Sequence, residues 1–265
     1  MKGDDRFLAL ADLAQDQWGM FTSAQAAESG VSAQHLKRLA DRFILTRIRH
    51  GVYRLTGTPI HPTDHVRAQW LALDPTHSAT ERIGSADPRG VASHRTAADL
   101  RQLGDIDADI AEFTVPRRRN TRSDGVRFHV ATLDPTHWSL LDGLPVTTTA
   151  RTIVDLASSR TDGGHLAGVV WDALRTDQVS RGQLESELRP FAHLYGAPLG
   201  DGAGLIAALI DDVAASDLRC APTDTRASRQ EEAAGEVGHG PGVLNILRDP
   251  ALPAALRALR KQGIV

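Results

Sequence analysis

The stretch from residue 21 to residue 55, FTSAQAAESGVSAQHLKRLADRFILTRIRHGVYRL, decides the fold of the first part of the chain. Thr22 stands where a helix N-cap is expected, and Gly30 is placed to end the short helix that follows. Ser32 then caps a second helix, predicted over residues 33–43. The side chains expected on its apolar face are Leu36, Leu39 and Phe43. The stretch therefore predicts two helices joined by a tight turn.

Two short strands are predicted directly after these helices, around a turn at Gly51. Alternation places Ile44, Thr46 and Ile48 on one side of this hairpin and Leu45, Arg47 and Arg49 on the other. Upstream, apolar residues at helical spacing predict another helix over residues 5–17. Three short helices followed by a hairpin are the anatomy of a winged helix-turn-helix, which we assign to residues 1–58.

Positive charge is concentrated in this first domain, although the whole chain carries a formal net charge of −3. Residues 32–55 hold six basic side chains against one acidic side chain, a net charge of +5. Solvated surface charge is the alternative explanation. The basic side chains nevertheless fall on the two elements with which a winged helix contacts DNA. The predicted DNA-binding residues are Gln34, His35, Lys37, Arg38, Arg42, Arg47, Arg49, His50 and Arg54.

A second domain of mixed helices and strands is predicted over residues 59–215, so the fold class is α+β. The segment TGTPIHPTDH reads as a linker by its proline and glycine content. Strands are expected at 110–116 and 126–133, as an antiparallel pair, and residues 75–90 as a loop. Helices are expected at 62–74, at 93–104, from 148 or 149, and at 163–175, 180–193 and 202–216.

The residues from 216 to 265 are predicted to form a flexible tail that ends in a short helix. Residues 217–242 contain scarcely any apolar side chains, so burial cannot offset the entropy lost on ordering. The single cysteine, Cys220, excludes an intramolecular disulfide and any site built from several cysteines. It is expected to be a chance surface or tail thiol.

A second basic cluster lies in the segment RRRNTRSDGVR, between the two predicted strands. It contributes Arg117, Arg118, Arg119 and Arg122, which are candidates for a secondary contact with DNA phosphates. Such loops are more commonly solvated turns, and both interpretations stay open.

The sequence predicts no catalytic centre, no metal site and no cofactor. Phosphate-binding loops, nucleophile elbows and H-E-x-x-H motifs do not occur in it. His61, Asp64 and His65 could offer metal ligands, but capping and solvent exposure are the preferred interpretation. His94 and Arg95 fall at the start of a helix capped by Ser93, where a packed histidine is favoured over a ligand-binding role. Arg151 and Asp155 are spaced to form an ion pair on one helix.

No signal-peptide pattern and no window of about 18 uninterrupted apolar residues is present, so we expect a cytoplasmic protein without a membrane partner.

Several motifs in order resemble the AbiEi-type antitoxins. Residues 21–55 resemble their N-terminal winged helix, and SHRTAADLRQLG, TVPRRR and GLPVTTTARTIVDLA resemble the domain that follows. The resemblance implies an antitoxin of a type IV toxin–antitoxin system of the kind used in phage defence. It further implies repression of its own operon through inverted repeats in double-stranded DNA. The implied functional partner is a nucleotidyltransferase-like toxin, countered without a stable complex.

Two alternatives stay open from the sequence. The chain could be a ligand-responsive winged-helix regulator without a toxin partner, or a degenerate restriction-endonuclease-like protein. The nuclease alternative is weakened because residues 165–265 read as helices and a polar tail. Neither alternative changes the prediction that the first domain binds DNA.

Overall fold

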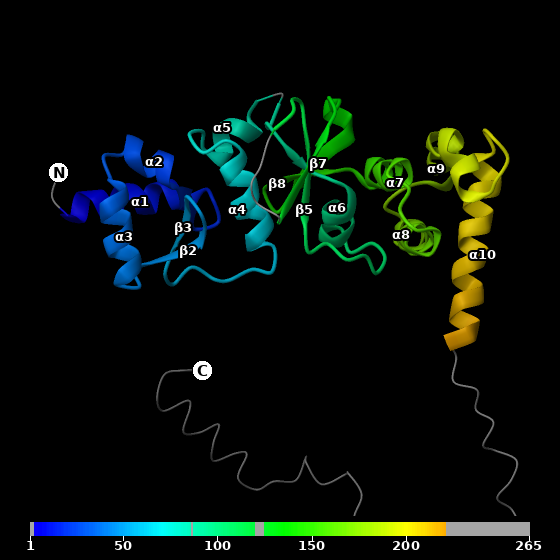
Figure 1. The fold of residues 1–265 in the computed structure, drawn as a ribbon, viewed down its shortest axis with the longest axis horizontal. Coiled ribbons are helices and arrows are strands. Elements are labelled where there is room, and N and C mark those ends of the chain that lie inside the picture. Colours follow the sequence, from blue (N-terminus) through cyan, green and yellow to red (C-terminus); the bar gives the residue numbers. More distant parts are fainter. Residues whose placement is uncertain (1–2, 86, 120–124, 221–265) are drawn as a thin grey trace, which may run out of the picture. The chain divides into compact units, whose positions relative to one another are not determined.

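The computed structural model describes residues 3–85, 87–119 and 125–220. Figure 1 shows the order of their helices and strands. The predicted tail and terminal helix of residues 221–265 lie outside the described part, as does Arg122. Residues 216–220 do not belong to a tail, because they continue the last described helix.

The first elements along the chain form the winged helix-turn-helix that the sequence predicts. They are α1 (Gly3–Gln15), β1 (Met20–Thr22), α2 (Ser23–Glu28), α3 (Ala33–Asp41), β2 (Leu45–Arg49) and β3 (Val52–Leu55). The strands pair antiparallel in the order β1-β3-β2. Thr22 caps α2 in a reciprocal capping box with Gln25, and Ser32 caps α3. The helix starts are therefore encoded as predicted.

Three details of this domain differ from the prediction. Strand β1 was missed because it is only three residues long. Phe43 follows the end of α3 with a φ of +59° and is 83% exposed, so it is not part of the buried helix face. Leu45 is buried whereas Arg47 is exposed, and the pairing of β2 with β3 shifts between Arg47 and Arg49. This bulge breaks the strict alternation assumed for the hairpin.

The next elements form the predicted α+β region. They are α4 (Asp64–Leu73), α5 (Ala79–Ile83), β4 (Val91–Ala92), α6 (His94–Leu100), β5 (Ala111–Val115), β6 (Val126–Val130), the 3₁₀ turn η1 (Pro135–His137), β7 (Trp138–Leu141), β8 (Leu144–Thr147) and α7 (Thr149–Ser158). The strand order is β6-β5-β4-β8-β7. Residues 75–90 were expected to form a loop, but part of this segment forms helix α5. A capping box between Ser78 and Glu81 stabilises the start of this helix.

Strands β5 and β6 are parallel, so the predicted antiparallel pair is wrong. Residues 116–125 connect them. Ten extended residues span up to about 33–36 Å, about twice the length of a five-residue strand. The connection is therefore long enough to bring the chain back to the end from which β5 started, instead of turning tightly into an antiparallel hairpin.

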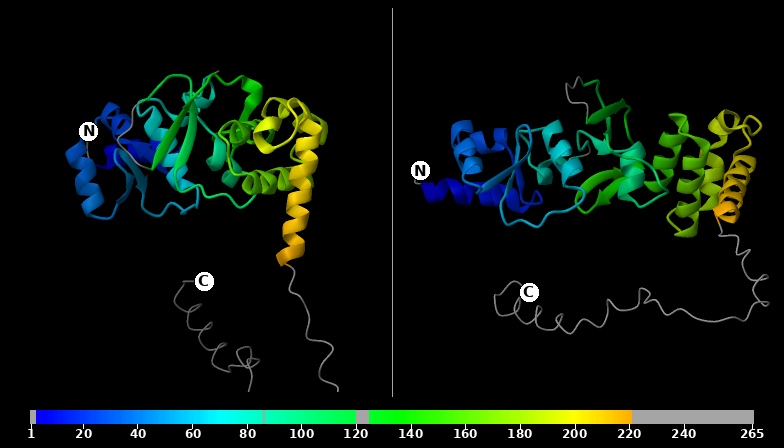
Figure 2. Two further views of the ribbon diagram at one scale, coloured as in Figure 1. Left: turned by 45° about the vertical axis from the view of Figure 1, so that its right-hand side comes forward. Right: turned by 60° about the horizontal axis from the view of Figure 1, so that its bottom comes forward.

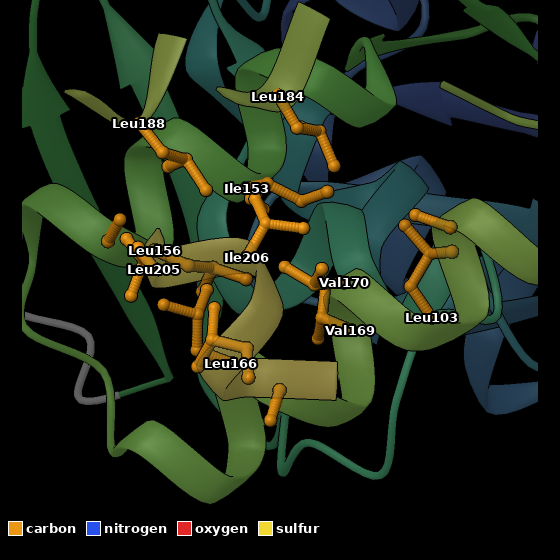
Figure 3. Close-up of a cluster of buried hydrophobic side chains, with 14 of the residues drawn as sticks. Leu103, Ile153, Leu156, Leu166, Val169, Val170, Leu184, Leu188, Leu205 and Ile206 are labelled. Atoms are coloured by element: carbon orange, nitrogen blue, oxygen red, sulfur yellow. The ribbon is translucent and has the colours of Figure 1, made fainter. Parts of the chain in front are cut away.

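The remaining helices pack around their own apolar core (Figure 3). They are α8 (Gly163–Arg175), α9 (Arg181–Glu187), the 3₁₀ segment η2 (Arg189–Tyr195) and α10 (Gly202–Cys220). Leu156 of α7, Val170 of α8, Leu184 of α9 and Ile206 of α10 are all buried in this cluster. Figure 2 shows α10 beside α8 and α9. The sequence periodicity predicted these helices close to their observed bounds.

The winged helix and α4 share one core, so residue 58 does not end a free-standing domain. Met20 and Val52 of the wing sheet belong to the same buried cluster as Trp70 of α4 and Phe113 of β5. Polar contacts cross the same junction: Trp18 donates its indole N–H to the carbonyl of Asp142 at 2.8 Å. The proline-containing segment after residue 55 is thus a surface connection between two packed parts.

Candidate nucleic-acid interface

Helix α3 exposes a continuous polar surface. Leu36 and Leu39 are buried, whereas Lys37 and Arg38 are exposed between them. The remaining predicted contacts on this side are Gln34 and Arg42, which are exposed, and His35, which is half-buried. The structure therefore presents the predicted residues of the recognition helix to solvent while its apolar stripe holds the helix in the domain.

The turn between β2 and β3 carries two of the predicted wing contacts. Arg47 and His50 are both exposed, and Arg47 Nη2 lies 2.7 Å from His50 Nδ1. Gly51 follows with a φ of +76°, which permits the tight turn. The wing thus offers a guanidinium and an imidazole side by side.

Arg54 is not available for a DNA contact, and its place among the predicted DNA-binding residues is corrected. Its residue is 7% exposed, and its Nη1 lies 2.7 Å from Oδ2 of Asp64. Arg67 reaches the other oxygen of the same carboxylate at 3.4 Å. The sequence analysis preferred capping and solvent exposure for His61, Asp64 and His65. His61 and His65 are exposed, but Asp64 is buried, so solvent exposure is wrong for Asp64.

Arg49 is half-buried and points toward the second region rather than freely into solvent. Its guanidinium donates to Oε1 of Gln69 on α4, and burial lowers the pKa of this side chain. Arg119 lines the same pocket and donates to the carbonyl oxygen of Leu73. Arg49 belongs to the first basic cluster and Arg119 to the second, 70 positions later in the sequence. The structure brings these two residues to one pocket. Arg117 and Arg118 are exposed nearby in the chain.

A comparison with known families covers the segment that carries this surface. Residues 9–56 match the family model described as "Transcriptional regulator, AbiEi antitoxin". Over these residues the chain is similar to the AbiEi antitoxins. The match spans every described residue of α3 and of the β2–β3 hairpin. The AbiEi resemblance drawn from the sequence is therefore confirmed for this domain.

One solved structure gives a further comparison for this chain. The crystal structure of the RV2827C protein from Mycobacterium tuberculosis is 17% identical, covers 75% of this chain and 79% of its own, and has a TM-score of 0.43. No curated protein matches the chain. Within the described residues, no helix is long and apolar enough to cross a membrane.

A buried polar cluster outside the AbiEi domain was largely missed by the sequence reasoning. His94, Glu112 and His129 bring their ligand-capable atoms within 4.8 Å of one another. His94 was considered, but Glu112 and His129 were not. Both occupy alternate positions in strands whose other positions are apolar, which is a readable signal of a shared polar face. The predicted ion pair of Arg151 with Asp155 is present at 2.8 Å.

Proposed function

We propose that the chain is a DNA-binding repressor of its own operon, with α3 in the major groove and the β2–β3 turn on the backbone. The supporting observation is the exposed row on α3, next to the exposed Arg47 and His50 of the wing. Lysine and arginine can read guanine and glutamine can read adenine, while wing arginines position the protein on phosphate. Arg54 is left out of this interface because it is buried.

The second basic cluster extends the proposed footprint. Arg49 and Arg119 face one pocket, and Arg117 and Arg118 are exposed beside it in the sequence. A phosphate backbone leaving the wing would meet these guanidinium groups. Their contribution is to affinity and salt dependence, because phosphate contacts carry no direct sequence information.

Replacing Arg47 with alanine tests the wing contact. The side chain is exposed, so the fold is expected to stay intact while one phosphate contact is lost. The slope of log K against log salt is expected to fall in magnitude by about 0.9 for both operator and non-specific DNA. Fluorescence anisotropy titrations of the full chain at several salt concentrations measure it. Arg181→Ala on α9, which also removes one exposed arginine, is the matched control and should leave the slope unchanged. An unchanged slope in Arg47→Ala would remove the wing from the interface.

We further propose that the protein is the antitoxin of a type IV toxin–antitoxin system. The AbiEi match of the winged helix supports this, and the order of the motifs downstream of it is consistent with the same family. The functional partner would be a nucleotidyltransferase-like toxin encoded next to it and countered without a stable complex. In this role the protein acts in the cytoplasm and without catalysis.

Co-expression with the neighbouring gene tests the antitoxin role separately from DNA binding. We assign neutralisation of the toxin to the region after the winged helix. Growth arrested by the neighbouring gene product is therefore expected to be restored by the full chain and equally by Arg47→Ala. Colony counts after induction measure the rescue. If the neighbouring product is harmless, or if its toxicity is not relieved, the ligand-responsive regulator becomes the better account.

A further inference from the structure

The polar side chains of β5 and β6 share one face of the sheet. The parallel register sets Glu112 opposite Arg127 and Thr114 opposite His129. The residues between them on these strands are apolar, and Phe113 packs in the core on the opposite face. The face that carries Glu112 is therefore polar although β5 is buried along its whole length.

His94, the first residue of α6, completes this polar face. Its ring stacks on that of His129 with centroids 3.5 Å apart and planes 13° from parallel. His94 is 6% exposed and has a φ of +53°, a conformation that is uncommon outside glycine. The chain thus holds this imidazole against its neighbour at a strained backbone position.

Ser93 orients the His94 ring instead of capping the helix. It occupies the N-cap position of α6, but its side chain makes no capping hydrogen bond. Its Oγ lies 3.0 Å from His94 Nδ1 and accepts a hydrogen bond from Thr114 Oγ1 at 2.9 Å. This arrangement occupies Nδ1 of His94, so Nε2 is the ring nitrogen that would serve as a ligand. It matches the way metal-binding histidines are commonly fixed through their second nitrogen.

Glu112 places a negative charge next to these rings. The residue is 3% exposed, and its two oxygens meet Arg127 Nη1 at 3.1 Å and His129 Nε2 at 3.2 Å. Burial by itself would raise the pKa of the Glu112 carboxyl, but the His129 hydrogen bond and the neighbouring positive charges lower it.

We propose that His94, Glu112 and His129 form a binding site for a divalent transition metal ion of the zinc class. Two imidazole nitrogens and one carboxylate oxygen are a donor set that Zn²⁺ accepts, with a fourth position left for water. Ligand atoms about 2.0–2.1 Å from a tetrahedral ion lie about 3.4 Å apart. The ligand-capable atoms lie within 4.8 Å of one another, and the two stacked rings would have to turn out of their parallel arrangement for their nitrogens to converge on one ion.

The surroundings of the three ligands also favour a cation. Asp155 on α7 is buried, with its Oδ1 paired to Arg151 at 2.8 Å and its Oδ2 unpartnered by any described group. The Arg127 side chain, which pairs with Glu112, is 56% exposed and can turn into solvent when an ion takes its place. An ion at this point would link β5, β6 and the start of α6, so its binding should also stabilise the fold.

Zinc titration of the full, tag-free chain tests the site. After treatment with a chelator and dialysis, the protein is expected to bind one equivalent of Zn²⁺ tightly and to melt at a higher temperature when the ion is present. Co²⁺ should occupy the same site and give the visible absorption of a four- or five-coordinate ion. Isothermal titration, thermal melting and absorption spectra provide three independent readouts that do not depend on DNA binding or toxin rescue.

Variants locate the ion within the chain. Glu112→Gln and His129→Asn are expected to weaken Zn²⁺ binding by about 100-fold or more, and Ser93→Ala by about tenfold, because Ser93 only positions a ligand. His61→Gln, which removes an exposed histidine elsewhere, should bind as the parent does. Circular dichroism distinguishes a variant that no longer binds Zn²⁺ from one that no longer folds. If a ligand variant does not fold, Ser93→Ala still tests the site, because it removes no ligand. A folded parent chain without a stoichiometric ion, or equal binding by Glu112→Gln, would overturn the proposal.

Discussion

Replacing Asp64 with alanine is expected to lower the free energy of unfolding by about 3–5 kcal/mol. Asp64 is buried and meets Arg54 at 2.7 Å and Arg67 at 3.4 Å. Its removal leaves two buried guanidinium groups without their carboxylate, and an uncompensated buried charge is costly. Urea unfolding followed by circular dichroism measures the change, which should appear as a lower midpoint with a similar slope.

A matched substitution shows that the loss comes from burial and pairing. Asp12 on α1 is exposed, and Asp12→Ala is expected to change stability by no more than about 0.5 kcal/mol. Arg54→Ala should destabilise the protein much as Asp64→Ala does. A stable Arg54→Ala variant with weakened DNA binding would contradict the burial of this arginine and return it to the interface.

Replacing Lys37 and Arg38 together with alanine is expected to weaken operator binding by about 100-fold or more. Both side chains are exposed on α3, and each good base or phosphate contact contributes about 1–3 kcal/mol. Alanine is a strong helix former, so α3 should persist. Binding curves on operator and scrambled duplexes, recorded at the same salt concentration, measure both affinity and discrimination.

The control for this double variant removes two exposed basic side chains far from α3 in the sequence, both of them arginines. Arg175 and Arg181 lie on α8 and α9, and each pairs only with a neighbour on its own helix in the described structure. Arg175→Ala combined with Arg181→Ala changes the net charge equally and should leave operator affinity within about twofold. Equal losses in the two double variants would show that overall charge, rather than α3, governs binding.

The winged helix could be predicted from sequence because its signals are local. Thr22 and Ser32 cap their helices as expected, and the apolar spacing of Leu36 and Leu39 sets the buried face of α3. Local signals could not show that Arg54 pairs with a residue ten positions later in the next helix. A basic residue in a basic hairpin looks the same in sequence whether it meets phosphate or a buried carboxylate.

The proposed metal site shows a different limit of prediction. Its three residues are spread over 36 positions and come from a helix start and two strands. Placing Glu112 beside His129 requires the parallel register of β5 and β6, and the sequence favoured an antiparallel pair. Once that register is known, the alternation of polar residues in both strands is explained by their common face.

The core shared by the winged helix and α4 makes the proposed DNA-binding surface part of a larger cooperative folding unit. Met20 and Val52 lose their packing when Trp70 and Phe113 separate from them. Unfolding of the region after residue 58 would then also disorder the wing sheet, instead of leaving the winged helix folded. Under the proposed repressor function, operator occupancy would be coupled to the folding equilibrium of the region after residue 58, and heat or proteolysis acting there would relieve repression.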